Sequence, residues 1–549
     1  MNKPSVSSET LQHIEPLIAL EFSAEQREMM LLDLEVQLAR CAAMRELAIA
    51  NSVAPAEVFD PRLPGFDMPA TAAVRFSQVA PPPLPDNEAD IAFASLTTLA
   101  AWLRTRALSS VDLTNIYLAR LQRLGPALDC VVTLTADLAR EQAHAADAEI
   151  KAGNYRGALH GVPWGAKDLF DTAGIATTWG AAPYKDRIAT TDAAVVRRLA
   201  EAGAVLVAKT TLGALAQGDV WFGGRTCNPW NVKEGSGGSS AGSAAAVSAG
   251  LCGFAIGTET LGSIVSPSMR CGTTGLRPTF GRVSRAGAMA LCWSLDKAGP
   301  ICRTVEDTAL VLDALNGYDV DDAGSISAPF AFDSERSIAG LRIAYDPAWF
   351  DDERADPLDM KVIEMLRDAG VHTVELKLAK LPYDSLWLIL AVEAAAAFDE
   401  LTVSGRAALM KRQDHFAWPN LFRKARLVPA VDFVNAQRLR RMVMQEMARA
   451  YADVDAIVGP SFAGPMQLIT NLTGHPALTL RTGIVERGSR AGIAQIGLLG
   501  NMRADNDVPT HAVPHGITLW GRLFDEGRLL NLGMAIERDF DVWHLRPPQ

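Results

Sequence analysis

The sequence has few cysteines and no metal-binding pattern. Its 549 residues include seven cysteines, an odd number, and none of them forms a CxxC pair. Scattered thiols of this kind are typical of a reducing cytoplasm rather than of a disulfide-bonded secreted protein. The HExxH motif and the paired Cys/His ligands of zinc sites are also absent. We therefore expect no metal, no cofactor and reduced thiols at Cys41, Cys130, Cys227, Cys252, Cys271, Cys292 and Cys302.

Basic clusters and long apolar runs are absent as well. The formal net charge is −11. An acidic chain without basic clusters gives no electrostatic surface for nucleic acid or anionic lipid, so neither is expected as a partner. The first residues, MNKPSVSSETLQHIEP, lack the apolar core of a signal peptide. No run of about 18 large apolar residues is present to span a membrane, and a cytoplasmic protein is predicted.

The N-terminal region has the pattern of a helical module joined to a larger body. A helix is predicted over residues 23–48, where Ser23 and Gln26 form a capping box. The proline-rich segment VAPPPLPDN, residues 79–87, is typical of an extended linker. We therefore predict a helical module with its linker over residues 1–87, which wraps or caps a main domain over 88–549. The apolar face of the predicted helix contains Met30, Leu34, Leu38, Cys41 and Met44.

After residue 88, helices and strands alternate. Residues 96–150 have helical periodicity around a strand-like DCVVTLT, and the helical DAAVVRRLAEAG precedes a buried strand, AVLVA. This alternation predicts an α/β fold in which helices cover both faces of a sheet. Residues 322–450 are mostly helical with few motifs, so we expect a variable cover over the site. The predicted strands are 129–135, 204–208, 253–259, 341–346, 371–376 and 455–460.

A run of small residues, GSGGSSAGSAAAVSAG, occupies positions 235–250. A flexible linker is disfavoured because the run continues into helical and strand-like sequence. A phosphate-binding loop is disfavoured because GxxxxGK[ST] and GxGxxG are both absent. The pattern GxSxG around Ser240 matches a nucleophile elbow, for which His475, His511 and His515 are candidate bases. However, an elbow follows a hydrophobic strand, whereas the preceding NPWNVKEGS is a polar turn.

A further interpretation uses lysine as the base. Serine is a poor nucleophile and needs a base to activate it. Lysine titrates near 10.4 in water, so holding it neutral at pH 7 costs roughly 4–5 kcal/mol, which burial can supply. Lys167 follows the nearly uncharged HGVPWGA, although taken alone it has the pattern of a surface lysine. Ser263 lies in GTETLGSIVSP, just after a buried-strand pattern, where backbone N–H groups can converge as an oxyanion hole.

Together these segments resemble the amidase signature family. Its glycine- and serine-rich signature is similar to GSGGSSAGSAAAVSAG followed by GTETLGSIVSP, and its lysine motif to GVPWGAKDLFDTAGIATTWG. Later segments also resemble it: CGTTGLRPTFGRVSRAG, SLDKAGPICRTVEDTALVLDAL and PHGITLWGRLFDEGRLLNLGMAIE. The likeness covers roughly residues 90–320 and 453–540. It implies that residues 88–549 form the catalytic domain, with a central mixed, twisted sheet flanked by helices on both faces.

The resemblance also implies a Ser–cis-Ser–Lys triad. Ser263 corresponds to the acylated nucleophile, Ser239 to the bridging serine and Lys167 to the base. The peptide bond from Gly238 to Ser239 is cis in the family, and Ser240 is expected to hydrogen-bond beside the triad. On this interpretation the GxSxG match is incidental. The implied oxyanion hole consists of the backbone N–H groups of Thr260, Leu261, Gly262 and Ser263.

The implied activity is hydrolysis of an amide or anilide, with esters or carbamates as further candidates. Three positions depart from the family pattern: Glu259 replaces an aspartate, Leu261 a glycine and Val265 an arginine. Loss of the arginine removes a partner for an anionic group. We therefore expect a small-molecule substrate that is neutral and apolar or aromatic. The sequence leaves the oligomeric state open, and a homodimer is one possibility.

Two other functions are considered. The family includes the A subunit of the tRNA-dependent amidotransferase, which draws ammonia from glutamine, and residues 22–61 resemble that complex's C subunit. The chain would then be a glutaminase-type subunit that works only inside a complex. The other is an inactive scaffold, against which the intact lysine and the two serines argue.

Overall fold

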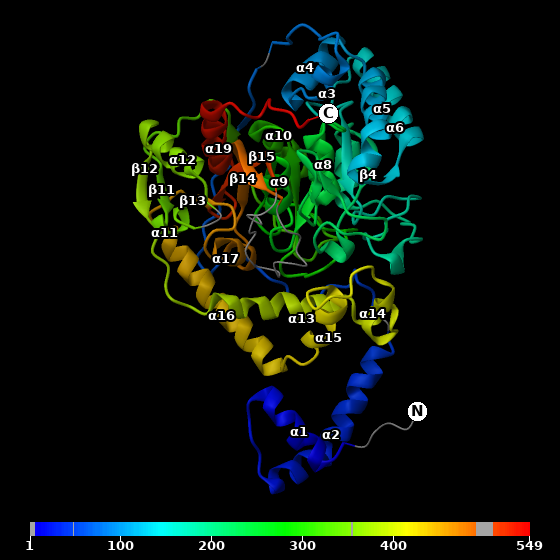
Figure 1. Ribbon diagram of the computed structural model, residues 1–549, viewed down its shortest axis with the longest axis vertical. Coiled ribbons are helices and arrows are strands. Elements are labelled where there is room, and N and C mark those ends of the chain that lie inside the picture. The colour runs from blue at the N-terminus through cyan, green and yellow to red at the C-terminus, as the bar shows by residue number, and fades with distance from the viewer. Residues whose placement is uncertain (1–5, 48, 79, 353–354, 490–508, 549) are drawn as a thin grey trace.

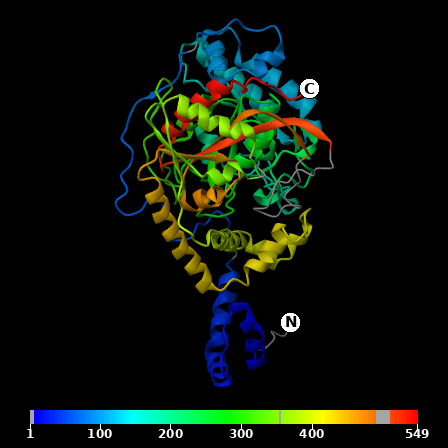
Figure 2. The same ribbon diagram turned by 60° about the vertical axis from the view of Figure 1, so that its left-hand side comes forward.

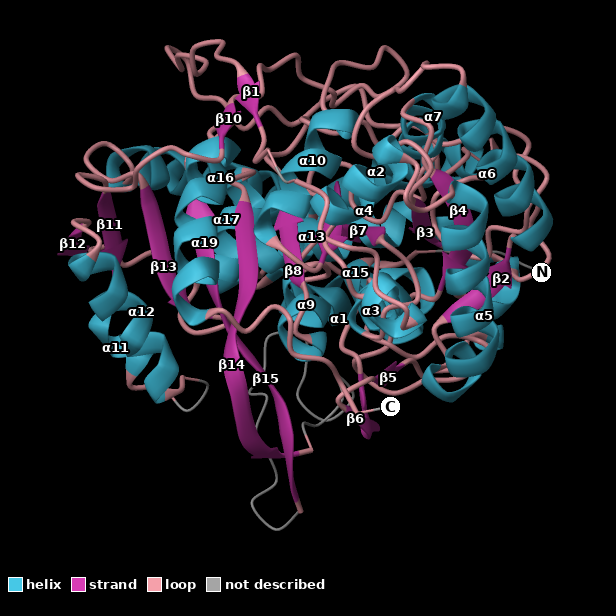
Figure 3. Cartoon of the chain, turned by 90° about the horizontal axis from the view of Figure 1, so that it is seen from above, coloured by secondary structure: helices cyan, strands magenta, loops and turns pink. Residues whose placement is uncertain are grey.

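The computed structural model describes residues 6–47, 49–78, 80–352, 355–489 and 509–548. Its centre is an 11-stranded mixed sheet, with helices on both faces (Figure 3). The α/β fold expected from the alternation of helices and strands is therefore present. In sheet order the strands are β12 (His372–Glu375), β11 (Arg342–Tyr345), β13 (Ala456–Pro460), β15 (Thr510–Gly521), β14 (Ala477–Gly488), β8 (Thr274–Arg277), β9 (Lys297–Cys302), β7 (Phe254–Glu259), β3 (Pro163–Lys167), β4 (Val205–Thr210) and β2 (Val131–Leu134).

All six predicted strands are confirmed, each within two residues of its expected bounds. They are β2, β4, β7, β11, β12 and β13. Five strands of the large sheet were not predicted: β3, β8, β9, β14 and β15. The case of β3 shows why, since its sequence PWGAK has no β-branched residue, yet all five positions are buried. Tight packing between β4 and β7, both parallel to β3, selects these small residues.

Helix α8 (Ala241–Ser248) explains the low bulk of the glycine- and serine-rich run. All eight of its residues are buried. A Cβ atom on Gly242 would lie 2.4 Å from the backbone nitrogen of Thr211, so a larger residue does not fit there. The other helices of the body are α3 (Glu88–Ala92), α4 (Leu96–Thr105), α5 (Ser110–Leu128), α6 (Ala136–Lys151), α7 (Ala194–Glu201), α9 (Val265–Cys271), α10 (Val305–Leu315), α17 (Met466–Thr473) and α19 (Glu526–Phe540).

The region 322–450 combines a cover of helices with the edge of the sheet. Its helices α13, α15 and α16 lie below the sheet in Figure 1. Strands β11 and β12, both predicted, belong to the same region. Its helices are α11 (Pro347–Phe350), α12 (Pro357–Asp368), α13 (Trp387–Ala397), α14 (Asp399–Val403), α15 (Trp418–Ala425) and α16 (Ala430–Ala450). Two pairs of short strands complete the description: β1 (Val74–Arg75) with β10 (Phe332–Asp333), and β5 (Cys227–Asn228) with β6 (Asn231–Gly235).

Helices α1 (Ser8–Ile18) and α2 (Ala24–Arg45) form a hairpin that projects away from the body (Figures 1 and 2). The predicted helix is confirmed, and Ser23 and Gln26 form its capping box. Its apolar stripe is covered only in part, because Leu34 and Cys41 are half-buried whereas Met30, Leu38 and Met44 are 40%, 46% and 57% exposed. The separation of a module at residue 88 stays a prediction.

The seven cysteines are free thiols, as expected, and five of them are buried. Among the described residues no helix is both long and apolar enough to cross a membrane.

Candidate active site

Lys167 lies at the carboxyl end of β3 and is completely buried. Its Nζ donates hydrogen bonds to Ser239 Oγ at 2.9 Å and to Ser240 Oγ at 3.0 Å. It also contacts Thr258, at 2.8 Å to Oγ1 and 3.3 Å to the carbonyl oxygen. The lysine and the two serines that the sequence places 72 and 73 residues apart therefore meet in one cluster.

The environment of Lys167 favours the neutral amine. Burial lowers its pKa well below the ordinary value, and the carboxylates of Asp296 and Glu259 oppose this only in part. Across the described ranges, no acidic side chain lies within ion-pair distance of Nζ. A lysine without a carboxylate partner loses hydration on burial and gains no opposite charge in return. Lys167 is thus placed to accept a proton from a neighbouring hydroxyl.

Ser239 and Ser240 precede helix α8, and both are fully buried. The peptide bond between Gly238 and Ser239 is cis, as the resemblance implied. A Cβ atom on Gly238 would lie 1.9 Å from the carbonyl oxygen of Gly218, so only glycine fits at this point. Ser240 Oγ accepts a hydrogen bond from the N–H of Thr258 and donates one to its carbonyl, each at 3.1 Å. Ser240 thus fastens the start of α8 to β7.

Ser263 lies in the loop that joins β7 to α9, and it is 7% exposed. Its carbonyl accepts a hydrogen bond from the N–H of Ser240 at 3.2 Å, which links the loop to the serine-rich turn. Its hydroxyl has no hydrogen-bond partner within the part of the chain that the structure describes. Gly262 has a φ of +86°, a left-handed conformation that glycine adopts without strain. The backbone N–H groups of this loop also find no acceptor among the described residues. They belong to Thr260, Leu261, Gly262 and Ser263.

Glu259 holds this loop in place. One carboxylate oxygen accepts the N–H groups of Ile264 and Val265, at 2.8 and 3.0 Å. Burial raises the pKa of Glu259, but the charge of Arg277 and the hydrogen bonds outweigh it and lower the pKa to about 2. The glutamate, which departs from the family's usual aspartate, is therefore an anionic anchor at the start of α9. Its other oxygen accepts hydrogen bonds at 2.6–2.8 Å from Arg277, Gln467 and Asn471.

A second contact ties the loop to the segment before β9. The Thr260 hydroxyl donates to Asp296 at 2.5 Å. The other oxygen of Asp296 accepts the N–H groups of Leu291 and Cys292, at 2.8 and 2.9 Å. Neither Thr258 nor Asp296 was singled out from the sequence. Thr258 lies inside the motif GTETLGS and could have been noticed there, whereas no spacing in the sequence marks Asp296.

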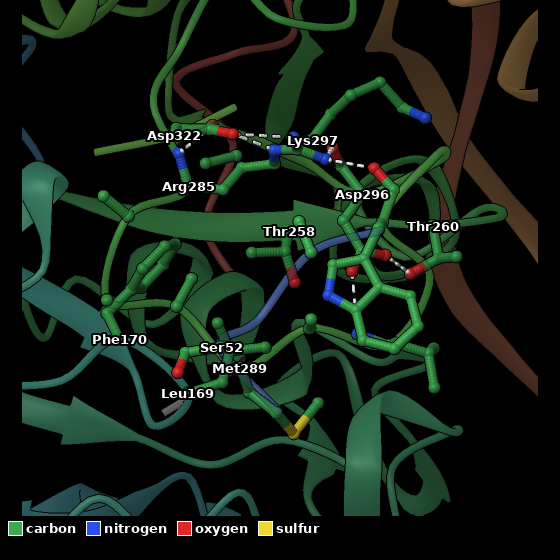
Figure 4. Close-up of a pocket in the computed structure, with 18 of the residues that line it drawn as sticks. Ser52, Leu169, Phe170, Thr258, Thr260, Arg285, Met289, Asp296, Lys297 and Asp322 are labelled. Atoms are coloured by element: carbon green, nitrogen blue, oxygen red, sulfur yellow. Dashed lines mark hydrogen bonds and ion pairs between the residues drawn. The ribbon is translucent and has the colours of Figure 1, made fainter. Parts of the chain in front are cut away.

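A cavity of about 140 Å³ lies beside this cluster (Figure 4). Thr258 and Thr260 line it, so the cavity adjoins the residues that contact Lys167 and hold the loop. Two basic residues line it. Arg285 forms an ion pair with Asp322 at 2.8 Å, and Lys297 donates to the carbonyl of Leu295, while burial lowers the pKa of Lys297 well below its ordinary value. The lining otherwise includes apolar side chains, namely Leu169, Phe170, Ala216, Met289, Leu291 and Trp293.

The three histidines considered as bases have surroundings other than the two candidate serines. His475 contacts Thr473 Oγ1 at 2.8 Å, and burial, with a contribution from Arg277, lowers its pKa to about 3. His515 pairs with Asp359 at 2.9 Å. His511 lies in β15 opposite Arg487. For the residues described, no hydrogen bond joins any of these histidines to Ser240 or Ser263.

Comparison with known proteins gives the family. The family model named Amidase matches residues 112–530. The chain belongs to the Amidase family. The A subunit of glutamyl-tRNA(Gln) amidotransferase from Pseudomonas syringae pv. syringae is 35% identical over 486 residues, which cover 83% of this chain and 99% of that protein. The recognition of the amidase signature is thereby confirmed.

Solved structures agree with this assignment to the Amidase family. The native peptide amidase from Stenotrophomonas maltophilia is 28% identical, with a TM-score of 0.70 over 83% of this chain and 98% of that one. A bacterial aryl acylamidase of the amidase signature family, at 22% identity, shares the fold with a TM-score of 0.69 over 83% of this chain and 99% of its own. The amidase-signature fold is therefore confirmed, and the chain is an amidase-signature hydrolase.

The structure shows where two of the residues that depart from the usual Amidase sequence lie. Leu261 is half-buried against the main core, next to the N–H groups of the loop. Val265 is completely buried within that core, and its N–H is bound by Glu259. The valine therefore adds no polar group to the site.

Proposed function

We propose that this chain is a serine amidohydrolase that cleaves a neutral amide or anilide through an acyl-enzyme on Ser263. The observation that carries the proposal is the buried Lys167, which lacks a carboxylate partner and donates to Ser239 at 2.9 Å. A base that is neutral at physiological pH can activate a serine in the way that histidine does in other hydrolases.

The proton passes along the cluster while acyl transfer proceeds. The hydroxyl of Ser263 attacks the substrate carbonyl and gives its proton to Ser239, whose own proton moves to Nζ of Lys167. The developing oxyanion is stabilised by the unbonded N–H groups of the loop 260–263. When the intermediate collapses, the relay returns a proton to the leaving amine and the C–N bond breaks. A water molecule, deprotonated through the same relay, then releases the acyl group from Ser263.

The cavity supports a neutral substrate group. Arg285 is already paired with Asp322, and burial lowers the pKa of Lys297 well below its ordinary value, which favours the neutral amine. Neither side chain therefore offers an uncompensated cation to a carboxylate. Apolar and aromatic side chains form much of the remaining wall. An aryl or alkyl group of an amide fits this lining better than an anionic group does.

The second candidate is a glutaminase-type subunit that is active only inside an amidotransferase complex. It is favoured by the 35% identity to the amidotransferase protein from Pseudomonas syringae pv. syringae, whose length is matched over 99%. The exposed part of the apolar stripe of α2, with Met30, Leu38 and Met44, would suit a protein partner. Hydrolysis of neutral anilides by the purified chain alone argues for the first candidate. Activity that is confined to glutamine and needs added partner chains would support the second.

The direct test is Ser263→Ala. We expect loss of amide hydrolysis without loss of folding, whereas the matched control Ser266→Ala, in the first turn of α9, keeps it. Mass spectrometry of the wild-type protein mixed with a slowly hydrolysed ester or anilide should locate the acyl group on the peptide that contains Ser263. Normal turnover by Ser263→Ala, or an acyl group on Ser240, would refute the proposal.

A further inference from the structure

The segment that follows α2 is joined to the loop before β9. The Asn51 side chain donates to the carbonyl of Ala290 at 2.8 Å and accepts the N–H of the same residue at 2.9 Å. It also donates to the carbonyl of Ala397, the last residue of α13, at 3.1 Å. The backbone carbonyl of Asn51 accepts a hydrogen bond from the Trp293 indole at 3.3 Å. One asparagine therefore connects the N-terminal segment, a cavity loop and the helical cover.

The next residues of this segment form part of the cavity wall. Ser52 and Ala54 both line the cavity beside Thr258 and Thr260. In Figure 4, Ser52 lies on the side of the cavity where Leu169 and Met289 are found. Both side chains are small, so they leave space at this point of the cavity. A larger side chain here would occupy the space that a substrate group needs.

Contacts further along fix the other end of the wall. Phe59 packs edge-on against Phe280, with ring centroids 5.1 Å apart, and the Arg440 guanidinium lies 3.4 Å from the Phe59 ring centre. Phe66 contacts Phe524 in the same manner at 6.1 Å. The segment from Asn51 to Phe59 is thus held at both of its ends and behaves as part of the body.

We propose that residues 51–54 form a specificity-determining wall of the substrate cavity, in which Ser52 and Ala54 limit the size of the substrate group and Asn51 positions them. This inference rests on the proposed amidohydrolase function. The wall lies outside residues 112–530, which match the family model. Selectivity would then depend on a part of the chain that contributes no group to the proton relay.

The first test narrows the cavity. Ala54→Trp is compared with Ala56→Trp, two residues further on. Both alanines are exposed, but only Ala54 lines the cavity. One substrate series lengthens the acyl group from acetamide to naphthamide, and the other enlarges the amine of an acetamide. We expect Ala54→Trp to lower kcat/KM for the largest members of one series about tenfold or more, with little effect on acetamide. Ala56→Trp should leave both series unchanged.

A second measurement does not depend on how a tryptophan variant folds. Ser52→Cys is made in a background without the two half-exposed thiols, Cys41→Ala and Cys227→Ala. The folded enzyme is assayed, treated with methanethiosulfonates of increasing size and assayed again. Activity towards large substrates should decline in step with the size of the label, while acetamide hydrolysis persists.

Asn51→Ala tests the positioning role. Without the hydrogen bonds of Asn51 the wall loosens, and the enzyme should discriminate less between small and large substrates. We expect the ratio of their kcat/KM values to approach one, through a change in KM rather than in kcat. An equal loss for every substrate would assign Asn51 a purely structural role and overturn this part of the proposal. If the wild-type protein hydrolyses amides but neither Ala54→Trp nor the labels change selectivity, the wall is refuted while the proposed function stands. If the wild-type protein hydrolyses no amide, both fail.

Discussion

Replacing Glu259 by glutamine should destabilise the protein and misplace the loop that carries Ser263. The carboxylate accepts five hydrogen bonds, shared between its two oxygens. An amide has one oxygen only, so its NH₂ group must face at least two of these donors. The Arg277 cation would then be buried without its anionic partner, which lies 2.6 Å away in the wild-type protein.

The cost can be worked out in two ways. The fall of the Glu259 pKa from 4.5 to about 2 corresponds to roughly 3 kcal/mol of folding free energy. Leaving one partner of a buried ion pair unpaired costs about 3–5 kcal/mol in other proteins. The two routes overlap at the low end, so we expect a loss of about 3 kcal/mol or more for Glu259→Gln at pH 7. Because the folded pKa lies below the unfolded value, this stabilisation is present above pH 4.5 and is lost as the pH falls through about 2.

Urea unfolding at neutral pH, followed by tryptophan fluorescence, measures the loss. The midpoint for Glu259→Gln should lie well below that of the wild-type protein, and the gap should shrink in acid. The double variant Glu259→Gln/Arg277→Met removes the stranded cation and should cost less than the sum of the two single variants. In the folded fraction, kcat should fall more than KM rises, because Glu259 holds the loop whose N–H groups form the proposed oxyanion hole. Equal midpoints for wild type and Glu259→Gln would refute this account.

The other expectations concern the base. Lys167→Met should reduce kcat by about 10²–10⁴-fold, the usual contribution of a general base, while circular dichroism shows a folded protein. In the wild-type protein, burial lowers the pKa of Lys167. Activity should therefore fall as the pH decreases through that pKa, because Nζ becomes protonated and no longer acts as a base. A profile of kcat/KM against pH that shows no decrease at low pH would contradict this role. His475→Ala, His511→Ala and His515→Ala should each retain acyl-enzyme formation, and loss of the acyl-enzyme in any of them with the fold intact would restore the nucleophile-elbow interpretation.

The parts of the fold that followed from sequence are those in which local pattern and burial agree. The apolar runs of β4 and β7 become strands buried at most positions. The sequence PWGAK of β3 carries no such pattern, because its small residues reflect packing between neighbouring strands rather than local preference. The helix predicted over residues 23–48 from its cap and periodicity is present as Ala24–Arg45. The exposure of its apolar stripe was not, since periodicity shows that a face exists but not what covers it.

The candidate site shows the same division. Lys167, Ser239 and Ser263 could be singled out because the likeness to a known family marks each of them. The contacts of Asp296 with Thr260 and of Asn51 with Ala290 join positions 36 and 239 residues apart, and neither has a motif. Side chains that position a site need only the right reach and polarity. Their residue types are therefore weakly constrained, and a single sequence does not distinguish them from ordinary surface residues.

Burial alone does not identify the base, because three lysines are buried among the described residues: Lys167, Lys209 and Lys297. Burial lowers the pKa of all three. Lys209 lies 3.3 Å from the carboxylate of Asp168, and this ion pair favours the charged amine. Lys297 donates a hydrogen bond to the carbonyl of Leu295, which has no proton to give. Lys209 also contacts a hydroxyl, that of Thr177 at 2.7 Å, but it keeps its carboxylate partner. Among these three, Lys167 alone combines contacts to hydroxyls, which can both donate and accept a proton, with the lack of a carboxylate partner. The chemistry of the neighbours, rather than the depth of burial, is what makes Lys167 the base of the proposed relay.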